Sequence, residues 1–285
     1  MAQASPAQPT ASSTTPIKRL CLSDAKKGGS NLPSRIVGYG RPAVGKTSFA
    51  AYFERPIFLM SPGETGLHTL MDSGQLPNDI PNLEVPDWQS YIGLIEDLTT
   101  KEHQRKTLVI DVVNGMEKLA NEFTRERDYG GDENTFMAYQ AGYRTVAMGV
   151  WKESLVALDK LRREKQMMIL MLAHTGAAKV PNPQGLDYQK WAPAFDGRWA
   201  WESTFAWADI VLFADFDIAV VKEKGESKAK GRGGNRRFFR TNWEPGFDAK
   251  NRHGFPDEIE MGNSGKEAWD NFSAALNEKA VESNG

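Results

Sequence analysis

One stretch of the chain carries glycine, lysine and threonine at a spacing that suits phosphate chemistry. Residues 40–47 read GRPAVGKT, which matches the P-loop pattern G-x-x-x-x-G-K-[ST]. In a P-loop, backbone N–H groups surround nucleotide phosphates, the lysine reaches the β- and γ-phosphates, and the threonine holds Mg²⁺. A short strand is expected before the loop and a helix after it, and the helix dipole favours bound anions. The residues expected to bind the nucleotide are Gly40, Arg41, Pro42, Ala43, Val44, Gly45, Lys46, Thr47 and Ser48.

A candidate Mg²⁺ ligand follows an apolar segment further along the chain. Residues 106–111 read KTLVID, an apolar strand ending in Asp111, which is typical of a Walker B motif. The carboxylate of that motif holds Mg²⁺ directly or through water. Many strands end in aspartate, so the assignment of Asp111 as a metal ligand depends on its position downstream of a P-loop. We predict that the metal ligands are Thr47 and Asp111.

Two further polar residues follow segments that predict buried strands. Glu64 comes shortly after the apolar segment 56–60, and His174 comes directly after the apolar segment 167–173. Ligands of mostly parallel sheets bind at the carboxyl ends of the strands, so we expect both residues at the edge that holds the P-loop. The plainer alternatives are that Glu64 caps a turn and that His174 only ends a strand.

A long segment rich in aromatic and basic residues follows His174. Residues 176–200 lack hydrophobic periodicity, and a loop of this length in a compact domain is usually functional or disordered. Aromatic rings stack on unpaired bases while cations meet phosphates. The expected contacts with single-stranded DNA are Lys179, Tyr188, Lys190, Trp191 and Arg198. A different role, packing of a helix against the sheet, is favoured for Trp199, Trp201, Phe205 and Trp207.

A second basic segment lies between two short apolar arms, residues 218–221 and 237–240, which predict a hairpin. Residues 222–240 contain eight basic residues and two glutamates, in a chain whose net charge is −2. A nucleic-acid site in such a chain must be a local patch of this kind. The expected phosphate contacts are Arg232, Arg236 and Arg237, and the alternative is a solvated loop.

These residues need a scaffold that brings distant strand ends together. Apolar segments of strand length alternate with helical patterns, which predicts an α/β fold with a mostly parallel sheet, helices on both faces and a C-terminal β-hairpin. The expected helices after the P-loop helix cover residues 88–98 with Asp87 as N-cap, 114–128, 135–165 and 264–281. The expected domains are a disordered tail over residues 1–32, a P-loop core over 33–262 and a C-terminal helix and tail over 263–285.

The composition narrows the class of protein. A chain of 285 residues, 40% of them hydrophobic, suits one sizeable domain. The single cysteine, Cys21, excludes an internal disulfide framework and is typical of a reducing compartment. The sequence contains no apolar run of membrane-spanning length and no signal peptide, so we expect a cytoplasmic protein without a membrane partner.

Taken in order, the motifs resemble those of the phage-encoded RecA-like ATPases that act as single-strand DNA annealing or recombination proteins. These proteins are small, single-core relatives of the ATPase domain of RecA and DnaB, so the resemblance implies a RecA-like P-loop core over residues 33–262. The motifs that carry it are GRPAVGKT at 40–47, Phe58-Leu59 leading to Glu64, LVID at 108–111, Ala173-His174, ADIVL at 208–212 and AKNRHG at 249–254.

The resemblance implies a role for each polar residue. Glu64 would orient and activate the attacking water, and His174 would sense the γ-phosphate and pass its presence to the loop that follows. Lys250 and Arg252 would enter the ATP site of a neighbouring subunit, unless they form only a basic turn. The family pattern places its glutamate directly at the strand end, whereas two residues are inserted before Glu64 here, which would slow hydrolysis.

The sequence therefore predicts a Mg²⁺-dependent, DNA-stimulated ATPase that promotes strand annealing or recombination. Its expected cofactors are ATP and Mg²⁺. Its expected partners are single-stranded DNA, copies of itself in a ring or filament with ATP at the subunit interfaces, and a single-strand-binding protein. The alternatives are a nucleotide-gated DNA-binding protein with negligible hydrolysis, a helicase or packaging motor subunit, and a small-molecule kinase.

Overall fold

The computed structural model describes residues 21–25, 31–221 and 230–282. The chain divides into two units, residues 1–31 and 32–285. In the first unit, Leu22–Asp24 form a single 3-10 turn, η1. Most of the tail predicted over residues 1–32 lies outside the described residues, as do residues 222–229 of the second basic segment.

The second unit is built on one mixed sheet. Its strands are β1 Arg35–Gly40, β2 Pro56–Met60, β3 Asn82–Glu84, β4 Thr107–Asp111, β5 Met168–Val180, β6 Tyr188–Pro193, β7 Ile210–Val221, β8 Lys230–Arg240, β9 Lys250–Asn251 and β10 Glu258–Glu260. Their order is β10-β8-β7-β1-β5-β4-β2-β3, with β6 paired to β5 and β9 to β7. From β3 across to β7 every neighbouring pair is parallel. The predicted α/β fold with a mostly parallel sheet is confirmed.

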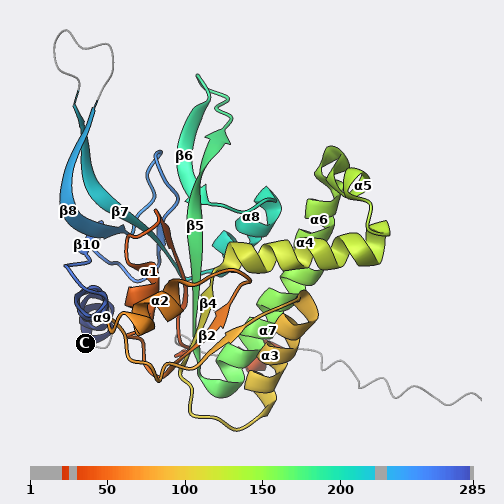
Figure 1. Ribbon diagram of the computed structural model, residues 1–285, viewed down its shortest axis with the longest axis horizontal. Helices are drawn as coiled ribbons and strands as arrows, with labels where there is room; N and C mark the ends of the chain where they lie inside the picture. Colours follow the sequence, from red (N-terminus) through yellow and green to blue (C-terminus); the bar gives the residue numbers. More distant parts are fainter. Residues whose placement is uncertain (1–20, 26–30, 222–229, 283–285) are drawn as a thin grey trace, which may run out of the picture. The chain divides into compact units, whose positions relative to one another are not determined.

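Helices cover both faces of this sheet. They are α1 Lys46–Ala50, α2 Gly66–Asp72, α3 Trp88–Thr100, α4 Val113–Tyr129, α5 Glu133–Met137, α6 Ala141–Met148, α7 Val150–Lys165, α8 Arg198–Trp207 and α9 Gly265–Glu282. Figure 1 shows α1, α2 and α9 on one side of the strands and α3, α4 and α7 on the other. Successive side chains of β1 point to opposite faces of the sheet. Ile36 packs with the first group of helices, and Val37 packs with the second. None of the helices in the described ranges has the length and apolar character of a membrane span.

The predicted start of α3 is confirmed, whereas the helix predicted after α4 is not. The side chain of Asp87 accepts a hydrogen bond from the Ser90 N–H at 2.7 Å, which confirms the predicted N-cap. The single helix predicted over residues 135–165 is wrong, because the chain there forms α5, the 3-10 turn η2 (Ala138–Gln140), α6 and α7. Tyr139 and Gln140 have positive φ angles, and Gly149 has φ −104° and ψ −110°, so the backbone leaves the helical region at both breaks.

The irregular loop predicted over residues 176–200 is also wrong. β5 continues past His174 to Val180 and returns as β6, pairing from Thr175 with Pro193 to Val180 with Tyr188. We call residues 175–193 the first hairpin. The helix α8 follows it. Trp201 is buried in the core, and the partly buried Trp199, Phe205 and Trp207 pack against that core, as favoured from the sequence.

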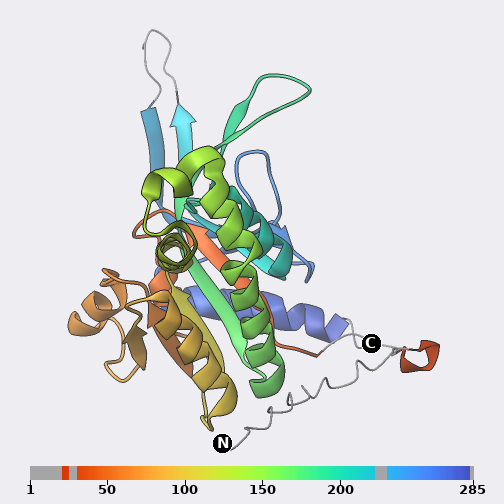
Figure 2. The same cartoon turned by 90° about the vertical axis from the view of Figure 1, so that its right-hand side faces the viewer.

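A second hairpin, formed by β7 and β8, is longer than predicted. The strand expected at residues 209–214 and the arm expected at 218–221 are one strand, with a shift of register between Phe216 and Ile218. Figures 1 and 2 show both hairpins projecting from the same end of the sheet. That end is the carboxyl edge of the parallel strands, at which β1 leads into the segment that the sequence predicts to bind phosphate.

Candidate active site

The P-loop leaves the sheet through two glycine positions that no other residue fits without strain. A Cβ on Gly40, at the end of β1, would lie 2.1 Å from the carbonyl oxygen of Ala214 on β7. Gly45, which precedes α1, has φ +98°, a left-handed conformation that glycine adopts without penalty. The short strand and the helix expected on either side of the loop are β1 and α1. The backbone of the loop is therefore shaped as phosphate binding requires.

Lys46 lies buried across this loop. Its Nζ donates to the carbonyl oxygens of Gly40 and Arg41, each at 2.9 Å. Burial lowers the pKa of Lys46 to about 8, and the charges of Asp111 and Glu64 oppose that shift. The ammonium is thus held within the loop with two carboxylates nearby, where it can pair with the phosphates of a nucleotide.

Thr47 and Asp111 meet at the same edge. The Thr47 hydroxyl donates to Asp111 Oδ2 at 3.0 Å, and Asp111 is 4% exposed. Burial is the main cause that raises the pKa of Asp111 to about 6; the Thr47 hydrogen bond opposes this shift, and the charge of Glu64 acts in the same direction as burial. One hydroxyl and one carboxylate are hard oxygen donors of the kind that hold Mg²⁺ together with substrate phosphates and water. The described residues contain no group of three His, Cys, Asp or Glu side chains that would hold a metal alone, so the donor set fits a cation shared with a nucleotide.

Glu64 contacts His174 above the end of β4. Glu64 Oε1 lies 2.9 Å from His174 Nε2. Residues 61–64 form a turn in which the Glu64 N–H donates to the Ser61 carbonyl at 3.2 Å and Gly63 has φ +82°. The Ser61 N–H in turn donates to the Asp111 carbonyl at 2.9 Å. This turn directs Glu64 back toward His174, and the local sequence pattern did not indicate that geometry.

The strand order explains why these groups converge. β5 lies between β1 and β4, and His174 pairs in register with Gly40 of the P-loop. Asp111 pairs with Leu172 on the other side of β5. The structure therefore brings Lys46, Thr47, Glu64, Asp111 and His174 together at one edge, as their positions at strand ends predicted.

Lys250 and Arg252 lie at the opposite edge of the sheet. The Lys250 ammonium donates to the carbonyls of Phe205, Ala206 and Ala208 at 2.6, 3.1 and 2.7 Å, where it caps the end of α8. Arg252 lies 3.6 Å from Asp209, at the start of β7, and its side chain is 54% exposed. β1 is about 17 Å long at ~3.3 Å per residue, so neither cation reaches the P-loop of its own chain.

The predicted contacts on the first hairpin occupy both of its faces. Tyr188 and Lys190 lie on one face, and Lys179 and Trp191 lie on the other, because side chains alternate along a strand. Lys190 is paired with the buried Asp248 at 2.5 Å. Lys179 is exposed and pairs with Asp187 at 2.8 Å. Of the two lysines, Lys179 is the one whose side chain faces solvent.

Trp191 instead connects the first hairpin to the P-loop. The Arg41 guanidinium lies 5.1 Å from the centre of the Trp191 ring, and its Nε lies 3.1 Å from Asp215 on β7. A residue of the P-loop thus touches both hairpins. Nothing in the local sequence indicated this contact, because the partners lie 150 and 174 residues away along the chain.

The remaining predicted nucleic-acid contacts differ in exposure and in the residues that they contact. Arg198, at the start of α8, is exposed and lies 4.9 Å from the Trp199 ring. Arg236 is exposed on β8 and lies 3.2 Å from Glu260. The guanidinium of Arg237 is turned toward the P-loop. Arg232 belongs to β8, but its side chain lies outside the described residues.

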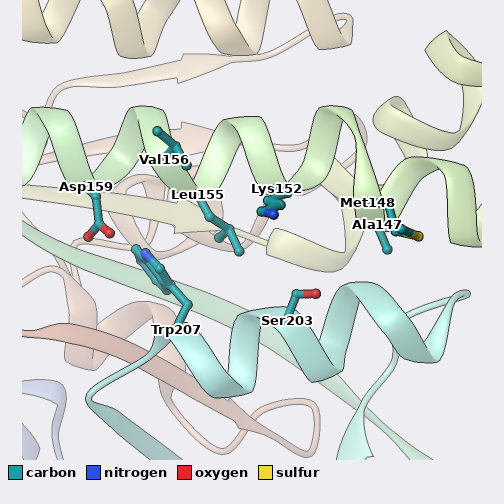
Figure 3. A pocket seen from close by; sticks show the side chains of 8 residues that line it. All are labelled: Ala147, Met148, Lys152, Leu155, Val156, Asp159, Ser203 and Trp207. Carbon is teal, nitrogen blue, oxygen red and sulfur yellow. The ribbon is translucent and has the colours of Figure 1, made fainter. Parts of the chain in front are cut away.

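A groove between α7 and α8 is separate from this site. Figure 3 shows that α7 contributes Leu155 and Val156 and that α8 contributes Trp207. Its volume is about 450 Å³, and the residues lining it include none of those predicted for the active site. One exposed aromatic residue near the first hairpin was missed from the sequence: Trp243, 56% exposed, belongs to a segment whose Phe247 bridges to Trp191.

Comparison with known proteins shows the family to which the chain belongs. The P-loop, the aspartate at the end of β4 and the mostly parallel strand order define a P-loop nucleotide-binding protein with an α/β core. The chain belongs to the AAA domain family, whose model matches residues 32–253. It is also similar to a crystal structure of the RadB recombinase, with 12% identity over 74% of this chain and 89% of that one and a TM-score of 0.38. None of the curated proteins matches the chain.

Proposed function

We propose that the protein is a Mg²⁺-dependent ATPase that binds single-stranded DNA as an oligomer and promotes strand annealing or recombination. The observation that carries the proposal is the Glu64–His174 contact, because it joins the polar groups around the P-loop to the strand that continues into the first hairpin. A polar residue at that position can respond to the nucleotide and alter the hairpin directly above it.

The residues of the site suit hydrolysis of a phosphoanhydride. Mg²⁺, when bound, supplies charge neutralisation at the phosphates. Lys46 and the loop N–H groups bind and orient the phosphates, and Thr47 and Asp111 provide the oxygen ligands for the cation. Glu64 orients a water and accepts its proton, and His174 holds the Glu64 carboxylate in place.

DNA binding is proposed at the end of the sheet from which both hairpins project. Lys179 and Arg236 are exposed cations on these hairpins, Tyr188 offers a ring, and Arg198 lies at the base of the first hairpin. Phosphates would meet the cations while bases stack on aromatic rings. A single-strand-binding protein is a further proposed partner on the same DNA.

Oligomerisation is proposed through the edge that carries Arg252. Arg252 cannot reach its own P-loop but is half-exposed, so it is available to a neighbouring copy. Insertion of this cation next to the nucleotide of the neighbour would make ATP part of the subunit interface, in a ring or a filament.

The test is phosphate release from Mg-ATP with and without single-stranded DNA, comparing the wild type with Lys46→Ala. We expect DNA to stimulate phosphate release by the wild type, and we expect the variant to release none.

A second candidate function is a nucleotide-gated DNA-binding protein. It is supported by the contact between Glu64 Oε1 and His174, because an oxygen that contacts His174 is not free to bind the attacking water. It would bind DNA in an ATP-dependent manner with no phosphate release, whereas absence of both activities would reject both functions. A kinase would consume ATP only with its acceptor and would not respond to DNA.

A further inference from the structure

Arg237 connects the second hairpin to the P-loop. It lies on β8 opposite Phe216 of β7, and its side chain is half-buried. Its Nη1 donates to the Val44 carbonyl at 3.3 Å, and its Nη2 donates to the Gly262 carbonyl at 2.8 Å. The two ends of one guanidinium therefore hold two backbone segments that are far apart in the sequence.

The contact with Val44 bears on phosphate binding through peptide geometry. In a trans peptide the C=O of one residue and the N–H of the next point in opposite directions. Because Arg237 holds the Val44 carbonyl, the N–H of Gly45 in the same peptide is directed away from the guanidinium. Backbone N–H groups of the loop are the ones that surround phosphates in a P-loop.

Gly45 leaves the room that this arrangement needs. A Cβ on Gly45 would lie 2.7 Å from Arg237 Nη1, in addition to the strain of a φ of +98°. The glycine of the P-loop thus serves two purposes here. It adopts the left-handed conformation, and it lets a guanidinium lie directly against the loop.

Gly262 gives the guanidinium a fixed second support. It precedes α9, and that helix packs on α1 through the ring pair Phe49–Phe272 and on the turn after α1 through Phe53–Trp269, with centroids 5.5 and 4.3 Å apart. The Met261 N–H also donates to the Arg237 carbonyl at 2.8 Å. Arg237 is therefore held between two rigid elements, which lowers the entropy cost of keeping its donors aligned.

The charge of Arg237 has no acidic partner among the described side chains. Its two hydrogen bonds go to neutral carbonyls, whereas Arg236 and Arg240 on the same strand pair with Glu260 and Glu258. A partly buried cation beside a phosphate-binding loop adds positive potential where an anion binds.

We propose that Arg237 is a positioning residue for nucleotide binding in its own subunit, fixing the Val44–Gly45 peptide and adding charge next to the phosphates. The inference rests on the nucleotide binding proposed above. It gives β8 a role at the nucleotide site, in addition to the role proposed for the second hairpin in DNA binding.

The test is binding of Mg-ATP, followed with a fluorescent ATP analogue in the absence of DNA. Arg237→Ala should weaken binding by roughly tenfold or more, because a charge-assisted contact is lost. Arg237→Lys should recover part of the loss, since one ammonium keeps the charge but cannot bridge two carbonyls. The matched control is Arg240→Ala, a half-buried arginine on the same strand, which should bind as the wild type does.

Added guanidinium ion separates positioning from a general effect on folding. It should restore nucleotide binding to Arg237→Ala and leave Lys46→Ala unchanged. Binding by Arg237→Ala at the wild-type level, or an equal loss in Arg240→Ala, would overturn the inference while leaving the proposed function intact. A wild type that binds no nucleotide would instead reject the proposed function. If Arg237→Ala fails to fold, the inference is tested with Arg237→Lys. Wild-type nucleotide affinity in that variant would show that the hydrogen bonds to the two carbonyls, of Val44 and Gly262, are not needed.

Discussion

Glu64 and His174 are in contact at 2.9 Å although their strands are not neighbours in the sheet. β4 lies between β2, which precedes Glu64, and β5, which carries His174. The pair therefore spans the end of the strand that bears Asp111. Since β5 continues without interruption into the first hairpin, a change at Glu64 has a direct route to that hairpin.

Replacement of Glu64 by glutamine tests its role in hydrolysis. Glutamine keeps the size and the contact with His174 but cannot accept a proton, so phosphate release should fall by about 100-fold or more. Binding of the ATP analogue should stay within a few-fold of the wild type. The matched control is Glu84→Gln, an exposed glutamate at the end of β3. Undiminished turnover in Glu64→Gln would exclude it as the group that activates water.

Replacement of Thr47 by valine tests the proposed metal ligand. Valine has nearly the same shape but no hydroxyl, so the gain in nucleotide affinity that Mg²⁺ provides should be largely lost. Titrations of the ATP analogue with Mg²⁺ and with EDTA measure that gain. Thr100→Val, on the exposed end of α3, is the control. An unchanged Mg²⁺ effect in Thr47→Val would contradict the assignment.

Replacement of Lys179 by alanine tests the first hairpin as a DNA contact. Loss of one phosphate contact should weaken single-stranded DNA binding and reduce the slope of log affinity against log salt by about 0.7. Nucleotide affinity should not change. Lys101→Ala, at the exposed lysine that caps the C-terminus of α3, should leave the salt dependence as it is. The same salt dependence in Lys179→Ala would remove this lysine from the interface.

Glu117 should make stability depend on pH. This residue of α4 is 1% exposed, and its carboxylate accepts the N–H groups of Asp196 and Gly197 at 2.8 and 2.9 Å. Burial raises its pKa from 4.5 to about 7, while these hydrogen bonds oppose the shift. Because the folded state holds the proton more tightly than the unfolded state, the free energy of unfolding should fall as pH rises from about 4.5 to about 7.

Urea unfolding at pH 5 and pH 8 measures this dependence. Between the two values the free energy of unfolding of the wild type should fall by about 2.5 kcal/mol relative to that of Glu117→Gln, which cannot ionise. Glu122→Gln, an exposed glutamate on the same helix, should follow the wild type. Parallel behaviour of the wild type and Glu117→Gln would show that Glu117 does not titrate in this range.

The parts of the fold and site that the sequence predicted are those with strong local patterns. The buried parallel strands are continuous apolar runs, and the polar residue that ends each run lies at the carboxyl edge of the sheet. Lys46, Thr47, Asp111 and His174 could be placed together for this reason. The position of Glu64 was harder to predict, because it depends on the turn at residues 61–63.

The first hairpin was missed because it has little apolar alternation. Residues 176–178 read GAA, which lacks the large apolar side chains that mark a half-buried strand. The break at Gly149 was missed for the opposite reason, since apolar residues continue at helical spacing on both sides of it. The contacts of Arg41 and Arg237 join residues far apart in the sequence, and no local pattern encodes such a pair.

The length of β7 has a mechanical consequence. This strand of 12 residues pairs with β1 from Ile210 to Ala214 and then rises into the second hairpin, and it begins beside Asp209, where Arg35 and Arg252 gather. Tension applied along the hairpin would load the β1–β7 hydrogen bonds in shear, so that they resist together and do not open one at a time. A pull on the hairpin is thereby carried past the P-loop to the far edge of the sheet, through a continuous backbone about 36 Å long at ~3.3 Å per residue.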